Sequence, residues 1–141
     1  MIMDAQNLFS TAQVFTATAV STNVIDLGAD RDVGLGRSIE IDTRVVVAYA
    51  GGTSLQVQVQ TATDAAFTTP IVVDAGPVVP VASLVVGFEP GRLRLASPTL
   101  RYVRLNYVVV GTMSGGGAIS AALVIDRQAN RAYPSGIPAQ V

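Results

Sequence analysis

Hydrophobic and polar residues alternate with a period of two along most of the chain, and this alternation predicts β-strands. The clearest case is residues 55–60, where Leu55, Val57 and Val59 alternate with three glutamines. Such a segment places its aliphatic side chains on one face of a sheet and its amides on the other. No segment shows convincing helical periodicity, although residues 64–67 could form a single turn. The pattern therefore predicts an all-β protein.

Glycines separate the predicted strands. The pair Gly51-Gly52 can supply the positive φ angles of a tight connection, which predicts a β-hairpin over residues 39–61. The run Gly115–Gly117 predicts the tip of a second hairpin, between the last two strands. About nine strands are expected in all, at residues 12–19, 23–27, 39–49, 55–60, 71–74, 81–86, 92–95, 101–110 and 118–126.

Short strands separated by Gly, Pro, Asn and Asp, with no βαβ alternation, are typical of two packed antiparallel sheets. A jelly-roll-like antiparallel β-sandwich with extended N- and C-terminal arms is therefore expected. It should form a single domain over residues 1–141, with its core over about residues 10–126. Residues 127–141 contain Pro134 and Pro138, cannot continue a central strand, and are expected to form the C-terminal arm.

The composition removes most of the side chains that carry chemistry. The chain has no His, Cys, Lys or Trp, so it lacks a group that titrates near neutrality, a thiolate and a Schiff-base amine. Charged residues make up only 13%, against about 25% in a typical soluble domain. Large, weakly charged surfaces usually mark association. We therefore expect a protein that binds other proteins, without enzymatic activity and without a cofactor.

Charge and hydropathy also argue against two classes of partner. With a net charge of −1, the chain has no overall positive field to attract nucleic acid. No apolar run approaches the roughly 18 residues of a membrane span, and the first residues lack the pattern of a secretory signal. The protein is expected to remain in the cytoplasm in which it is made, without binding nucleic acid or membrane.

One acidic loop could bind a hard cation. Asp26, Asp30 and Asp32 precede two glycines, and calcium takes its ligands from carboxylates and loop carbonyls. The alternative is that these aspartates form Asx-turns neutralised by Arg31 or Arg37. The second interpretation is preferred because Asp and Gly are ordinary turn formers, so no metal is predicted.

Two carboxylates on one predicted strand could resemble a glycosidase pair. Glu40 and Asp42 would lie roughly 7 Å apart at their backbones, and paired carboxylates are central to glycoside hydrolysis. The alternative is a solvated strand face paired with Arg44. It is preferred because sugar sites normally add aromatic platforms and a cleft, and aromatic residues are only 6% of the chain.

All nine cationic residues are arginines, whose planar forks suit bidentate pairing with carboxylates. Four of them, Arg92, Arg94, Arg101 and Arg104, lie on two strands that are predicted to be neighbours. They could bind an acidic partner surface, or form ordinary solvent-facing ion pairs. Nucleic acid is a weaker interpretation, because interleaved aromatic residues are missing beyond Tyr102.

The C-terminal arm offers further candidate contacts. Arg131, Tyr133 and Ile137 lie on a proline-containing segment that is already extended and would bind with little ordering cost. The alternative is a frayed terminus. The predicted partner-binding residues are Arg92, Arg94, Arg101, Arg104, Arg131, Tyr133 and Ile137.

Four segments together carry a resemblance to a known family: MIMDAQNLFS (1–10), STNVIDLG (21–28), GGTSLQV (51–57) and DRQANRAYPSG (126–136). The chain resembles the capsid cement, or decoration, proteins of short-tailed bacteriophages, of the kind known from a Bordetella phage. The resemblance implies a structural virion protein, made in the bacterial host cytoplasm, that binds the outer surface of a head built from an HK97-like major capsid protein. It also implies a homo-oligomer, with a dimer as the expected form, that stabilises subunit contacts non-covalently.

A second function remains open. The chain could be a carbohydrate- or receptor-binding β-sandwich of a virion fibre or surface. That function needs an exposed aromatic platform, which only the phenylalanines and Tyr49, Tyr102, Tyr107 and Tyr133 could supply.

Overall fold

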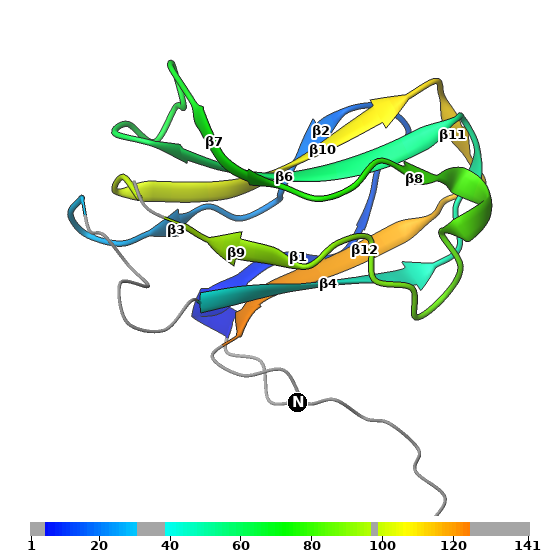
Figure 1. Ribbon diagram of the computed structural model, residues 1–141, viewed down its shortest axis with the longest axis horizontal. Helices are drawn as coiled ribbons and strands as arrows, with labels where there is room; N and C mark the ends of the chain where they lie inside the picture. The colour runs from blue at the N-terminus through cyan, green and yellow to red at the C-terminus, as the bar shows by residue number, and fades with distance from the viewer. Residues whose placement is uncertain (1–4, 31–38, 97–98, 125–141) are drawn as a thin grey trace, which may run out of the picture.

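The computed structural model describes residues 5–30, 39–96 and 99–124, which form two antiparallel sheets packed face to face (Figure 1). The four-stranded sheet has the order β1 (Leu8–Val14), β12 (Ala118–Val124), β4 (Ile39–Val47) and β9 (Leu93–Leu95). The six-stranded sheet has the path β2 (Ala19–Val20), β10 (Tyr102–Val110), β6 (Ser54–Ala62) and β7 (Ile71–Ala75), with β3 (Ile25–Asp26) on β10 and β8 (Val79–Pro80) on β6. Two 3₁₀ turns are η1 (Ala5–Asn7) and η2 (Val81–Ser83).

The strand order confirms the all-β sandwich and has the jelly-roll arrangement. With β2 and β3 taken as one interrupted strand and the two-residue strands β5, β8 and β11 left aside, β6 and β7 are the only successive strands of the described chain that share a sheet. Every other main connection crosses from one sheet to the other, as in two interleaved Greek keys. Within the described residues, no helix is long and apolar enough to cross a membrane.

Both predicted hairpins are wrong, although their strands exist. β4 and β6 lie in different sheets, and so do β10 and β12. Their two glycine-containing connections are corners between the sheets, and these corners pair with each other through β5 (Ala50–Gly51) and β11 (Met113–Ser114). Gly51 has φ +68, and a Cβ there would lie 3.1 Å from the backbone nitrogen of Ser114, so glycine permits this close approach.

Two predicted strands depart most from the structure. The first strand is β1, which begins at Leu8 and ends at Val14, before most of the predicted span of 12–19. The predicted strand at 81–86 is instead η2 followed by a β-turn, because Leu84 N–H donates to Val81 O at 2.9 Å and Phe88 N–H donates to Val85 O at 3.0 Å. The single turn at 64–67 is confirmed by the bond from Phe67 N–H to Asp64 O.

The core lies between the sheets and follows the predicted alternation. Leu55, Val57 and Val59 are fully buried, and the register places Val59 opposite Leu105 and Val57 opposite Tyr107. At the corner end the aromatic rings of Phe15, Tyr49 and Tyr107 pack together: the Phe15 centroid lies 5.3 Å from that of Tyr49 and 4.9 Å from that of Tyr107. Tyr107 Oη forms a buried hydrogen bond of 2.8 Å with Ser10 Oγ.

Side chains join the two sheets along both long sides of the sandwich. On one side, Gln13 Nε2 donates to Val20 O at 2.8 Å, and Gln13 Oε1 accepts from Thr22 N–H at 2.9 Å. On the other, Asp74 of β7 accepts the Arg94 N–H of β9 at 2.7 Å. These bonds occupy backbone groups that edge strands would otherwise present to another chain.

Candidate partner-binding surfaces

Arg101 is held in an ion pair beside the start of β10. Its Nε and Nη2 donate to Asp26 Oδ1 and Oδ2 at 2.8 and 2.9 Å, and its backbone N–H donates to Asp30 Oδ1 at 2.9 Å. The hydrogen bond from Arg101, helped by Gly28 N–H, lowers the pKa of Asp26 to about 2, and the same bond raises the pKa of Arg101. This arginine therefore fixes the acidic loop to the six-stranded sheet.

The same contacts bear on the cation hypothesis. Both oxygens of Asp26 accept hydrogen bonds from Arg101, and Gly28 N–H closes an Asx-type turn on Oδ1 at 2.8 Å. Among the residues that the structure describes, no three acidic side chains gather to bind a metal. Asp32 and the arginines predicted to neutralise this loop, Arg31 and Arg37, lie outside the described residues.

Arg104 supports a loop that folds over the outer face of the six-stranded sheet. Its Nε donates to Gln60 Oε1 at 2.9 Å, and its Cζ lies 4.1 Å from the centroid of the Phe67 ring. Burial lowers the pKa of Arg104, and Phe67 is itself 5% exposed. The Arg104 side chain is therefore held by a cation–π contact and an amide hydrogen bond within the chain.

The predicted amide face exists, and its amides bond mainly to one another. Asn106 Nδ2 donates to Gln58 Oε1 at 3.4 Å, Gln58 Nε2 to Gln56 Oε1 at 3.2 Å, and Gln56 Nε2 to Gly76 O at 2.9 Å. Gln56 and Gln58 are only partly exposed and Gln60 is buried. The internal bonds leave this face fewer donors and acceptors for a partner than the sequence alone indicates.

Arg92 and Arg94 are the exposed pair among the described candidate arginines. They flank buried Leu93 on β9, at the edge of the four-stranded sheet, and so share a face as predicted. The expectation that Arg92, Arg94, Arg101 and Arg104 lie on neighbouring strands is wrong, because β9 and β10 belong to different sheets. Arg131, Tyr133 and Ile137 lie outside the described residues.

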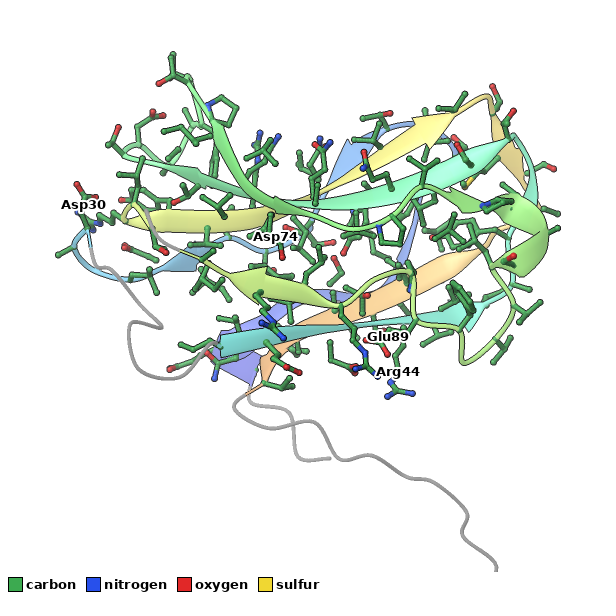
Figure 2. The ribbon with its side chains drawn as sticks, viewed as in Figure 1. Asp30, Arg44, Asp74 and Glu89 are labelled. Atoms are coloured by element: carbon green, nitrogen blue, oxygen red, sulfur yellow. The ribbon has the colours of Figure 1, made fainter. Side chains whose placement is uncertain are left out.

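Glu40 and Asp42 do not form an open carboxylate pair. Asp42 Oδ2 accepts from Arg44 Nε at 3.1 Å, as expected, but Asp42 is only 3% exposed and not solvated. Arg44 points away from the sandwich, next to Glu89 (Figure 2). Neither carboxylate lines the cavity of about 240 Å³ that lies between the sheets. Its walls are formed by Asn7 and by aliphatic side chains such as Leu27, Ile39 and Leu95.

The tyrosines of the described chain do not form an exposed aromatic platform. Tyr49 and Tyr107 are buried in the core, and burial raises the pKa of both. Tyr102 is half-buried, with Arg101 Cζ 5.0 Å from its ring centroid. Tyr133 lies outside the described residues. The described surface thus offers a carbohydrate ligand little of the stacking area that such sites use.

The structure reveals an apolar surface that the sequence reasoning missed. Val46, Val47, Val85 and Val86 are 38%, 46%, 54% and 66% exposed; we call them the valine cluster. Residues 84–88 run beside the end of β4 through bonds from Tyr49 N–H to Leu84 O and from Gly87 N–H to Val45 O. The signal was present in the runs Val45–Val47 and Leu84–Val86, since three consecutive aliphatic residues cannot all face one core.

Comparison with known families shows that the family model Bbp16 matches residues 9–123. This match suggests a Bordetella phage protein family and a virion-associated protein. A search of curated proteins finds no match.

Proposed function

This chain belongs to the Bbp16 family, and on that premise we propose that it is a capsid cement protein. It binds the outer surface of a phage head and stabilises contacts between subunits of an HK97-like major capsid protein. It acts without covalent chemistry, as a homo-oligomer with a dimer as the expected form. It is made in the cytoplasm of the bacterial host and acts on the assembled virion.

The observation that carries this proposal is that the exposed candidate arginines and the valine cluster both lie at the four-stranded sheet. Arg94 is exposed on β9 of this sheet and Arg92 is exposed directly before it, and the valine cluster lies at the end of strand β4. The first and the last strand of the described chain, β1 and β12, are also members of this sheet. We therefore assign the capsid-facing side to the four-stranded sheet.

Surface contact is the mode of binding that this fold favours. Asp74 and Gln13 already accept or donate hydrogen bonds where the two sheets meet, so a partner strand would have to displace them to extend a sheet. A head presents many equivalent sites, and each contact of an oligomer raises the effective concentration for the next. Individually modest interfaces can then hold the protein for long periods.

Cosedimentation with undecorated heads tests this function. The purified protein is mixed with heads that lack it, and the pellet is measured over a range of protein concentrations. We expect saturable binding at a fixed ratio to the major capsid protein. Heads that already carry a full complement of the protein are the control and should take up no more. Absence of saturable binding to undecorated heads would contradict the proposal.

A further inference from the structure

We infer that the valine cluster is the apolar anchor by which the protein binds the capsid, and that its counterpart is an uncharged apolar depression on the major capsid protein. This inference rests on the proposed function and adds to it the surface that makes the contact. It differs from the sequence-based expectation, which assigned the contacts to arginines and to the C-terminal arm.

The most exposed part of the valine cluster is the tip of a hydrogen-bonded β-turn. Phe88 N–H donates to Val85 O at 3.0 Å, and Gly87 has φ +84, which together define a turn of type II with Val86 at its second position. Val86, at 66%, is the most exposed large hydrophobic residue of the described chain. Turn positions favour Pro, Asn, Asp, Ser and Gly. Neither turn preference nor burial in the monomer explains a valine here.

The turn is held firmly against the sheet. Val45 N–H donates to Phe88 O at 3.0 Å, Gly87 N–H donates to Val45 O at 2.8 Å, and Tyr49 N–H donates to Leu84 O at 3.1 Å. These three bonds place residues 85–86 beside the segment 45–49 at the end of β4. In Figure 1 this segment follows η2 and passes beneath the end of β4. A surface ordered before binding loses little conformational entropy when a partner covers it.

The cluster carries no charge of its own. Residues 45–49 and 84–88 contain no Asp, Glu or Arg, and the ring of Tyr49 is buried. The counterpart should therefore be uncharged as well, because an unpaired ion covered by this surface would lose its hydration without compensation.

The size of the cluster favours the capsid over a second copy as its occupant. Its exposed surface amounts to roughly two fully exposed valines. A standard interface buries about 800 Å² on each partner, far more than this cluster could supply to a dimer in solution. A head presents equivalent sites side by side, so an oligomer can place more than one such anchor on it, and each contact raises the effective concentration for the next.

The test compares two variants of the full chain in cosedimentation with undecorated heads. Val85→Ser/Val86→Ser removes the apolar tip, and Ile71→Ser/Val72→Ser removes two residues of similar exposure, 47% each, from β7 on the other sheet. We expect the first variant to bind about ten- to a hundredfold more weakly, with the second close to the parent. Val47→Thr, which keeps the shape and strand preference of valine, should weaken binding in the same direction.

Salt provides a second readout. Binding through the valine cluster should persist at about 1 M NaCl, where exposed ion pairs are screened. Loss of parent binding at that salt concentration would assign the contact to arginines and overturn the inference. Equal binding by the parent and the Val85→Ser/Val86→Ser variant would also overturn it, while leaving the proposed function intact. Failure of the parent itself to bind would overturn both.

Discussion

Gly117 fills a position that no side chain can share with Tyr49. A Cβ on residue 117 would lie 2.3 Å from both Cγ and Cδ1 of the Tyr49 ring, and 2.8 Å from its Cα. The ring cannot simply move aside, because Phe15 packs against it at 5.3 Å and the side chain is only 6% exposed. Gly117→Ala should therefore overpack the corner between β11 and β12.

The expected cost is at the upper end of overpacking, about 3 kcal/mol. For a chain of this size such a loss lowers the melting temperature by about 10 °C. The matched control is Gly116→Ala. Gly116 has φ +67, but a Cβ on this residue would meet nothing within 4 Å, so its substitution adds backbone strain of about 1 kcal/mol without a clash.

The assay is thermal unfolding of the parent and both variants under identical conditions. Tyr49→Leu in the Gly117→Ala background should recover part of the loss, giving a coupling of about 1 kcal/mol or more in a double-mutant cycle. The reasoning is refuted if Gly117→Ala melts within about 2 °C of the parent, or if Gly116→Ala is the more damaging of the two. The first result would mean that Tyr49 does not pack against residue 117, and the second that backbone strain at residue 116 outweighs the clash.

Two further predictions concern polar groups. Tyr49 Oη is buried without a hydrogen-bond partner among the described residues, whereas Tyr107 Oη bonds to Ser10. Tyr49→Phe should therefore leave the urea midpoint unchanged or higher, while Tyr107→Phe costs about 1 kcal/mol; the opposite order would contradict these assignments. The pKa of Asp26 is lowered from 3.8 to about 2, so its ion pair with Arg101 stabilises the fold above pH 4 and is lost as pH falls toward 2. Asp26→Asn should flatten the acid side of a pH–stability curve between pH 4 and 2, and a curve as steep as that of the parent would argue against the pair.

The alternation of residues predicted which side chains are buried, but it could not predict how strands pair. Leu55, Val57 and Val59 are buried as expected, because a period of two fixes the face of each residue locally. The sheet that each strand joins depends on contacts far apart in sequence. A glycine pair such as Gly51-Gly52 suits a corner between sheets as well as a hairpin turn, and both predicted hairpins failed for this reason.

The candidate site shows the same limit. Arg94 and Arg101 are close in sequence, yet the chain crosses between sheets from β9 to β10 and separates them. The acidic partner of Arg101 lies 75 positions away, at Asp26, and could not be inferred from spacing. Runs of three aliphatic residues, by contrast, already break the alternation at Val45–Val47 and Leu84–Val86, so the valine cluster was open to prediction from the sequence.

The central claim, that this protein strengthens a phage head, is tested most directly by heating DNA-filled heads with and without it. DNA release is followed with a dye that cannot enter intact heads. If the protein is a cement, undecorated heads should release their DNA at a higher temperature once it is added, and the rise should level off when binding saturates. An unchanged release temperature at saturating protein would contradict the account.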